Sequence, residues 1–289
     1  MISPALTQGL IGEFGSKARD WLPQAESQIN ALAYRWGVQL TEPLHGATCS
    51  VVIAGLRLGE KVVLKLPYPE AEEADSISTM LAFASVGGVD VLESDSESGA
   101  VLMPRLDPGL NLAEFGASEE EAIDICAELI LQLRQAPQID RPDVWTWHEF
   151  LGKMEDPMAV EAAKIAVHLH RTSERKILLH GDFHHFNTLR SGDRWVVVDP
   201  KGLLGDPAFE VVGFMRNPEI SKDPNLTGRL RYRLHRFAKH LGDDPARLWG
   251  WSFVQTVSGG FWSSVGLDSP WRKTAASLWE LRDEFWSQH

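Results

Sequence analysis

One stretch of the sequence, residues 178–201, gathers the side-chain types that phosphoryl transfer requires. It reads LLHGDFHHFNTLRSGDRWVVVDPK and contains Asp182, Asn187 and Asp199. In this chemistry one carboxylate orients a hydroxyl group and accepts its proton, while an amide oxygen and a second carboxylate bind Mg²⁺ beside nucleotide phosphates. Each residue alone could cap a turn or end a strand, but the three in this order predict a phosphotransferase site.

A lysine on an earlier apolar segment fits the same chemistry. Val62-Val63-Leu64-Lys65 resembles the V-A-I-K strand of protein kinases, whose lysine neutralises phosphate charge and is oriented by a helix glutamate. The alternative is a surface lysine whose stem lies along apolar residues. Glu70, Glu72 and Glu73 follow. The alternative is that these residues only stabilise the N-terminus of a helix through its dipole and do not contact the lysine. We choose Glu73 as the partner of Lys65 because it lies deepest in the expected helix.

The periodicity of the N-terminal part predicts the elements that position this lysine. An amphipathic helix is expected over residues 17–36. The β-branched runs 47–56 and 60–66, joined at a Gly-Glu turn, predict a hairpin. A helix over 69–86, followed by strands at 89–93 and 99–103, completes a small, mostly antiparallel sheet with one packed helix.

Beyond residues 104–111, a connection rich in Pro and Gly, the pattern is mainly helical. The expected helices are 118–135, 145–172 with a break at Asp156-Pro157, 207–216, 226–241, 245–266 and 271–287. Strand-like runs interrupt them at 176–182, 188–190 and 194–200, and such runs often deliver side chains to a site. We therefore predict an α+β fold with a β-rich N-terminal lobe over 1–103, a hinge over 104–111 and a larger helical C-terminal lobe over 112–289.

The composition excludes several classes of function. The 289 residues carry 28 Lys and Arg against 40 Asp and Glu, and the net charge of −12 disfavours nucleic acid and anionic membrane surfaces as partners. Two cysteines are too few for a disulfide framework, and no apolar run approaches the roughly 20 residues that cross a bilayer. We expect a cytoplasmic protein with no nucleic-acid or membrane partner. The acidic balance agrees with a cationic small-molecule substrate.

Tryptophan is unusually frequent, with 11 Trp against 3 Tyr. Helix packing is one explanation, and an aromatic wall against a sugar or a cation is the other. The residues concerned are Trp249, Trp251, Trp262, Trp271, Trp279 and Trp286. Three acidic residues of the same lobe either hold an ammonium or guanidinium group of the acceptor or are simply solvated: Asp268, Asp283 and Glu284.

The string HGDFHHFN resembles the HGDxHxxN loop of the aminoglycoside phosphotransferase-like kinases. The segment DPKGLLGDPAFEVVGFMRNP, residues 199–218, is similar to the DPKG, GDPA and RNP signatures of streptomycin 6-kinases and the related hydroxyurea and aminoglycoside resistance kinases. LMPRLDPGLNL at 102–112 is similar to their hinge. The resemblance extends with gaps from about residue 40 to 220. It implies a bilobal protein-kinase-like fold that uses ATP and Mg²⁺.

The resemblance also implies roles for individual residues. Asp182 would be the catalytic base, with His180 bracing the loop and His184 standing where protein kinases carry a lysine. Asn187 and Asp199 would bind magnesium.

On the nucleotide side, the resemblance implies that Lys65 pairs with Glu73. The backbone from Met103 to Arg105 would receive the adenine, and Lys201 would contact phosphate. His185 and Glu210 depart from the family pattern, which often has Pro and Asp there, and these departures concern the acceptor side.

We therefore predict a kinase that phosphorylates a hydroxyl group of a small cationic molecule, by resemblance streptomycin or a related aminoglycoside. The alternative acceptor is another hydroxylated metabolite or drug, such as hydroxyurea or a sugar-like compound. A nucleotide-binding pseudokinase and a carbohydrate-binding protein are alternatives from other classes, against which the complete set of catalytic residues argues. A zinc hydrolase built on His180, His184 and His185 with Asp199 lacks a further His or Cys nearby.

Overall fold

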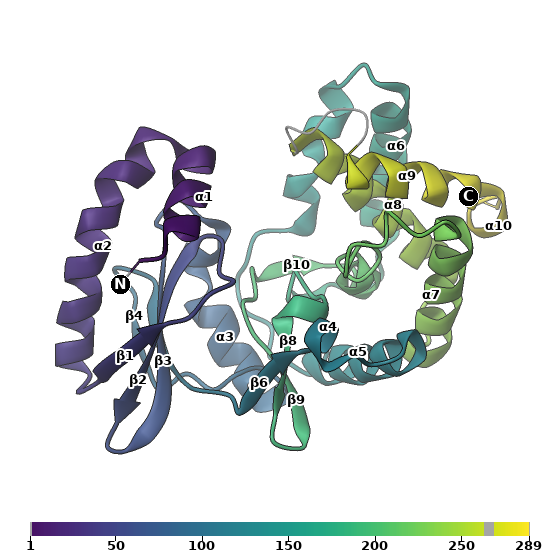
Figure 1. Ribbon diagram of the computed structural model, residues 1–289. Coiled ribbons are helices and arrows are strands. Elements are labelled where there is room, and N and C mark those ends of the chain that lie inside the picture. The colour runs from purple at the N-terminus through teal and green to yellow at the C-terminus, as the bar shows by residue number, and fades with distance from the viewer. Residues whose placement is uncertain (1, 263–268, 289) are drawn as a thin grey trace.

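The computed structural model describes residues 2–262 and 269–288 (Figure 1). Asp268 and the side chains of Glu72, Glu73 and Trp262 lie outside the described residues. The N-terminal part is a five-stranded antiparallel sheet in the order β1-β2-β3-β5-β4. Its strands are β1 (Gln39–Pro43), β2 (Ser50–Arg57), β3 (Glu60–Pro67), β4 (Glu93–Asp95) and β5 (Ala100–Pro104).

Two helices, α1 (Pro4–Phe14) and α2 (Ser16–Arg35), cover one face of this sheet, as Figure 1 shows. Alternate residues of β3 meet them, and Leu64 packs in their apolar cluster. Because side chains alternate along a strand, Val63 and Lys65 point to the opposite face, where Val63 joins a second apolar cluster. The strand therefore carries apolar core residues on both faces and places its lysine on the face opposite α1 and α2.

The predicted hairpin is confirmed, because β2 pairs with β3 in register from Ser50↔Pro67 to Arg57↔Glu60. The prediction of one helix over 69–86 is wrong: the segment forms a 3-10 turn at Glu72–Asp75, α3 (Ile77–Phe83) and a second 3-10 turn at Ala84–Val86. Ser76 stands between the first 3-10 turn and α3, as the N-cap residue of α3.

The strand expected at 89–93 is also misplaced, since β4 begins only at Glu93. Its position is set by the turn that follows, where the Asp95 carboxylate accepts a hydrogen bond from the Ser98 amide at 3.0 Å. That turn fixes the pairing of Asp95 with Ala100 in β5. Neither α1 nor β1 was expected from the periodicity.

The C-terminal part surrounds two small sheets with helices. One sheet has the order β6-β8-β9 and the other pairs β7 with β10. The strands are β6 (Pro108–Asn111), β7 (Ile177–Leu179), β8 (Thr188–Ser191), β9 (Arg194–Val197) and β10 (Leu203–Gly205). The helices are α4 (Leu112–Phe115), α5 (Glu119–Leu133), α6 (Pro157–Arg171), α7 (Leu226–Leu241), α8 (Pro245–Trp262), α9 (Pro270–Glu280) and α10 (Arg282–Phe285). No described helix is long and apolar enough to span a membrane.

Tryptophans of α8 pack inside this helical part. Trp249 and Trp251 are fully buried. Their indole N–H groups donate to the Leu278 carbonyl at 2.7 Å and to the Asp206 carboxylate at 2.9 Å. Trp279 and Trp286 pack against the same core. Helix packing, rather than an aromatic wall, thus accounts for these four.

The helix expected over 207–216 is replaced by a 3-10 turn at Pro207–Val211 and a series of turns. Gly213 lies so close to the chain that a Cβ there would stand 2.5 Å from the Phe183 carbonyl oxygen. The carbonyls of Phe214 and Asn217 are then taken by a side chain, Arg233 of α7, which is fully buried. A continuing helix could not have used the Phe214 carbonyl, because Pro218, four residues further on, has no backbone N–H.

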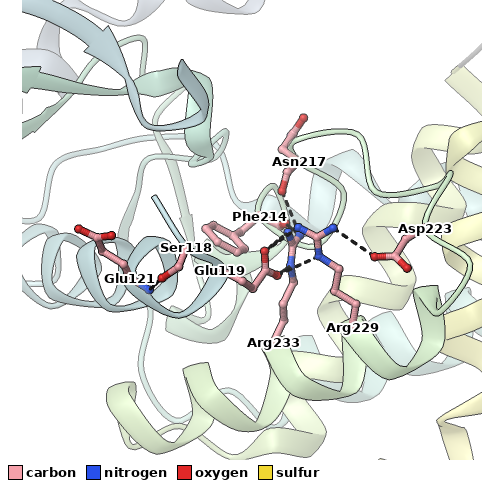
Figure 2. A network of polar contacts seen from close by, with 8 residues as sticks. All are labelled: Ser118, Glu119, Glu121, Phe214, Asn217, Asp223, Arg229 and Arg233. Atoms are coloured by element: carbon pink, nitrogen blue, oxygen red, sulfur yellow. Dashed lines mark hydrogen bonds and ion pairs between the residues drawn. The ribbon is translucent and has the colours of Figure 1, made fainter. Parts of the chain in front are cut away.

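Figure 2 shows the polar network that holds this arginine. Glu119, at the first turn of α5, receives hydrogen bonds from Arg233 and from Arg229, the latter at 2.6 Å. Arg229 also pairs with Asp223 at 3.2 Å. Burial alone would raise the pKa of Glu119, but the two guanidinium groups lower it to about 2. One carboxylate therefore fastens α5, α7 and the 214–217 segment together.

This network makes the free energy of unfolding depend on pH. The pKa of Glu119 is lower in the folded chain than its ordinary 4.5, so its ionised form stabilises the fold above about pH 4.5, and that stabilisation is lost as the pH falls toward 2. We expect Glu119→Gln to lower the free energy of unfolding by about 3 kcal/mol at pH 7 and by progressively less below pH 5.

Urea unfolding of both proteins at pH 7, 5, 4 and 3 measures this difference. Glu284→Gln is the matched control, because Glu284 forms an exposed pair with Arg231 and its loss should cost no more than about 1 kcal/mol. A Glu119→Gln deficit that stayed constant across this pH range would show that the carboxylate charge does not carry the effect.

Candidate active site

The side chain of Asp182 lies in the loop that follows β7, surrounded by basic groups. His184 Nε2 lies 3.5 Å and Arg216 Nη2 3.8 Å from Asp182 Oδ1, and Lys201 Nζ lies 4.0 Å from Oδ2. Burial would raise the pKa of Asp182, but the hydrogen bond from His184 and the neighbouring basic groups outweigh it and hold the pKa far below its usual range. Asp182 is therefore ionised at neutral pH.

His180 braces this loop from inside the protein. It is fully buried, its Nε2 lies 2.8 Å from the Val198 carbonyl oxygen, and its Nδ1 accepts a hydrogen bond from the Asp182 amide at 3.3 Å. Burial lowers its pKa to about 4, so the ring is neutral with its proton on Nε2. His180 thus fixes Asp182 relative to the strand that leads to Asp199.

Glu210 holds the same loop by its backbone. Its buried carboxylate accepts hydrogen bonds from the amides of His180, at 2.8 Å, and Gly181, at 3.2 Å. Burial raises its pKa to about 7, although the two amide donors favour the ionised form. The sequence drew attention to Glu210 only as a departure on the acceptor side, whereas the structure shows an anchor of the Asp182 loop.

Asn187 and Asp199 bring two further oxygen donors to this region. The Asn187 Nδ2 group donates to the Asp182 carbonyl at 2.9 Å, which ties the amide to the loop. Asp199 has a φ of 60°, a left-handed conformation that aspartate tolerates better than most residues and that is frequent at functional sites. One carboxylate and one amide oxygen fit Mg²⁺, which keeps several waters and phosphate oxygens as its other ligands.

A zinc site is not formed by the histidines. Within residues 2–262 and 269–288, no group of three His, Cys, Asp or Glu side chains is placed to hold a metal ion. His185 instead stacks on Phe214, with 4.0 Å between ring centroids, and burial lowers its pKa to about 3. The metallohydrolase alternative therefore lacks its ligand set.

Lys65 reaches this region from β3. The side chain is almost fully buried, and its Nζ lies 2.7 Å from Asp199 Oδ1. The predicted partner, Glu73, has no described side chain, so that pairing stays a prediction. This ion pair connects β3 of the N-terminal sheet to Asp199, which lies two residues after the end of β9.

A cavity of about 530 Å³ lies between the sheet and the C-terminal part. Apolar side chains such as Val63 and Met103 line it, together with Arg105 of the predicted adenine-binding segment. Lys65, Asn187 and Asp199 line it as well. The cavity therefore combines an apolar region, suited to a flat base, with the charged groups that a triphosphate requires. Lys201 lies outside this lining, beside Asp182.

For two of the acidic residues of this lobe, the structure favours the interpretation that they are simply solvated. Glu284 pairs with Arg231 and His235 on the surface of α7 and α10, and Asp283 lines a different depression with Trp286. Neither lies among the groups facing Asp182, so these two carboxylates do not form a pocket beside Asp182 for an ammonium or guanidinium group of the acceptor. The described residues that face Asp182 are basic.

Sequence reasoning missed one group of this site, Arg216. Its position in the RNP signature was the available signal, but a lone arginine in a turn carries no indication of what it faces. The structure places its guanidinium beside Asp182 and 4.1 Å above the ring of Trp271. Trp271 thus contacts a group that lies beside the predicted base.

The anchoring role of Glu210 can be tested directly. We expect Glu210→Gln to accelerate hydrogen exchange at the His180 and Gly181 amides at least about tenfold and to lower the free energy of unfolding by about 1–3 kcal/mol, because one acceptor oxygen is replaced by a donor. Glu210→Asp keeps both carboxylate oxygens, so its exchange rates and its free energy of unfolding should lie between those of the wild type and of Glu210→Gln. Exposed Glu219→Gln is the control. Unchanged exchange at both amides in Glu210→Gln would disprove the anchor.

Comparison with known proteins agrees with this geometry. Residues 35–266 match the family described as aminoglycoside/hydroxyurea antibiotic resistance kinase. A streptomycin 6-kinase of Streptomyces griseus is 27% identical over 271 residues, which cover 86% of each chain. A hydroxyurea phosphotransferase of Kitasatospora aureofaciens is 27% identical over 272 residues, or 86% of this chain and 76% of that protein.

Among solved structures, a thermostable aminoglycoside phosphotransferase mutant in a ternary complex with ADP and hygromycin B has a TM-score of 0.58 at 16% identity. The match covers 86% of this chain and 97% of that one. The shared fold confirms the predicted α+β, bilobal, protein-kinase-like architecture.

Proposed function

The chain belongs to the aminoglycoside/hydroxyurea antibiotic resistance kinase family, and on this basis we propose that it transfers the γ-phosphoryl group of ATP, with Mg²⁺, to a hydroxyl group of streptomycin or a related aminoglycoside. The observation that carries the proposal is the convergence of Lys65, Asn187 and Asp199 on one cavity, with Asp182 hydrogen-bonded through its carbonyl to Asn187. These are the groups that phosphoryl transfer requires.

In the proposed reaction Asp182 orients the acceptor hydroxyl. The hydroxyl oxygen attacks the γ-phosphorus, the bond from that phosphorus to the bridging oxygen of ADP breaks, and the hydroxyl proton passes to Asp182. Because the pKa of Asp182 is held low, its main contribution is orientation, and the proton moves late.

On the nucleotide side, Lys65 lies in the cavity where it can pair with phosphate oxygens, and the segment from Met103 to Arg105 would receive the adenine. Asn187 and Asp199 would hold Mg²⁺, which supplies neutralising charge to the phosphate oxygens when bound. His184 presents its Nε2 proton toward Asp182, because its Nδ1 accepts from the Phe186 amide at 3.3 Å. Its imidazole thus supports the ionised form of the base.

Hydroxyurea is the second candidate acceptor. Basic groups face Asp182 in the described part of the chain, and they suit a neutral hydroxyl compound at least as well as a cationic one. The hydroxyurea phosphotransferase of Kitasatospora aureofaciens, to which this chain is similar, takes its name from that acceptor.

Acceptor identity is tested by ADP release with ATP and Mg²⁺ in the presence of streptomycin, other aminoglycosides or hydroxyurea, and with no acceptor. We expect stimulation by streptomycin over the acceptor-free rate, because the relatives that cover most of the chain include streptomycin 6-kinases. Stimulation by hydroxyurea alone would replace the first candidate with the second. No stimulation by any hydroxyl compound would contradict the kinase proposal itself.

The role of Asp182 is tested by Asp182→Asn. We expect kcat to fall by about 10² to 10⁴ fold, because the amide neither accepts the proton nor carries the charge that orients the hydroxyl, while the affinity for ATP changes little. Asp283→Asn makes the same chemical change on the exposed surface of α10 and should leave kcat intact. Wild-type turnover in Asp182→Asn would exclude Asp182 as the base.

A further inference from the structure

The guanidinium of Arg216 is held beside Asp182 without being hydrogen-bonded to it. The closest approach is 3.8 Å, from Nη2 to Asp182 Oδ1, which is an ion-pair distance and too long for a hydrogen bond. Its Nε atom is buried and has no hydrogen-bond partner among the described residues. The side chain remains about 30% exposed. The Nε–H group is enclosed, so a ligand would meet the terminal N–H groups, of which Nη2 lies beside Asp182.

The surrounding structure holds the backbone on both sides of Arg216 and supports its guanidinium. Arg233 takes the carbonyls on both sides of it, at Phe214 and Asn217, and the Asn217 side chain donates to the Gly213 carbonyl at 2.9 Å. The indole of Trp271 supports the guanidinium from one face at 4.1 Å. Stacking on an aromatic face leaves the in-plane N–H groups of an arginine free to donate.

Neutralising Asp182 does not require this arrangement. Lys201 already places a positive charge 4.0 Å from the carboxylate, and His184 directs its Nε2 at it from 3.5 Å. Lys201 follows two residues after Asp199, and its Nζ lies 5.5 Å from the centre of the Trp147 ring. Arg216 comes from a different segment, between the Pro207–Val211 turn and α7, so its charge is directed at Asp182 from another part of the chain.

We propose that Arg216 binds the acceptor, donating a hydrogen bond to an oxygen atom adjacent to the hydroxyl that Asp182 orients. This inference rests on the proposed kinase function. It defines the acceptor class near the reacting atom: a hydroxyl whose neighbour is a carbonyl, hydroxyl or carboxylate oxygen. Ammonium or guanidinium groups of the acceptor then lie away from Arg216, because like charges in a partly buried site repel strongly.

The test replaces Arg216 in three ways and measures the acceptor that the panel identifies. Arg216→Met removes the donor and should raise the acceptor KM at least about tenfold, the loss expected for one hydrogen bond to a charged group. Arg216→Lys keeps the charge and should recover part of the affinity. Arg216→Glu should raise KM beyond the Met variant, since a carboxylate repels the acceptor oxygen.

Two measurements separate this role from a structural one. The affinity for ATP, measured with Mg²⁺ and no acceptor, should be unchanged in all three variants. Arg231→Met and Arg231→Glu make the same changes on an exposed arginine of α7 and should leave KM unchanged.

An unchanged acceptor KM in Arg216→Met would overturn the inference, as would a lower KM in Arg216→Glu, which would place a cationic group of the acceptor at this position. A fall in kcat with a shifted pH profile and an unchanged KM would assign Arg216 to Asp182 alone and would equally overturn it. Absence of turnover by the wild-type chain with every acceptor is the different result that contradicts the proposed function.

Discussion

Two carboxylates, Asp182 and Asp199, lie in neighbouring parts of one partly buried region, and much of the structure around them follows from that constraint. Charges removed from water are stable only when opposite charges and hydrogen-bond donors replace the solvent. Lys65 pairs with Asp199, while His184, Lys201 and Arg216 surround Asp182. These partners come from the N-terminal sheet, from the loop itself and from two later segments. The carboxylates therefore determine which parts of the chain have to meet.

A second layer of buried charges keeps those partners in position. Glu210 holds the backbone amides of His180 and Gly181, and Glu119 holds Arg233, which in turn holds the backbone around Arg216. Both glutamates bind backbone, directly or through an arginine, so they fix loops that have no regular hydrogen-bond ladder. Such loops acquire the rigidity of secondary structure without its geometry. This is how a helical domain can present irregular segments accurately to a reaction centre.

The sequence predicted the parts of this arrangement that depend on residues close together in the chain. The hairpin carrying Lys65 follows from β-branched periodicity, and the placement of Asp182, Asn187 and Asp199 near one another follows from their spacing in one stretch. The contacts of Arg216 and Glu210 could not be predicted, because they depend on where turns between residues 207 and 218 run through space. Those turns are fixed by Arg233, whose own burial depends on Glu119, 114 positions away. Helical periodicity contains no information about such a chain of long-range contacts.

The ion pair between Lys65 and Asp199 affects the energetics of ligand binding in the cavity between the sheet and the C-terminal part. In the ligand-free chain each of these groups is the counter-ion of the other, at 2.7 Å and with the lysine almost wholly buried. A phosphate group on Lys65 and a cation on Asp199, as proposed above, would separate this pair and give each member a new partner of opposite charge. Binding would accordingly be an exchange of counter-ions that leaves neither of these charges unpaired.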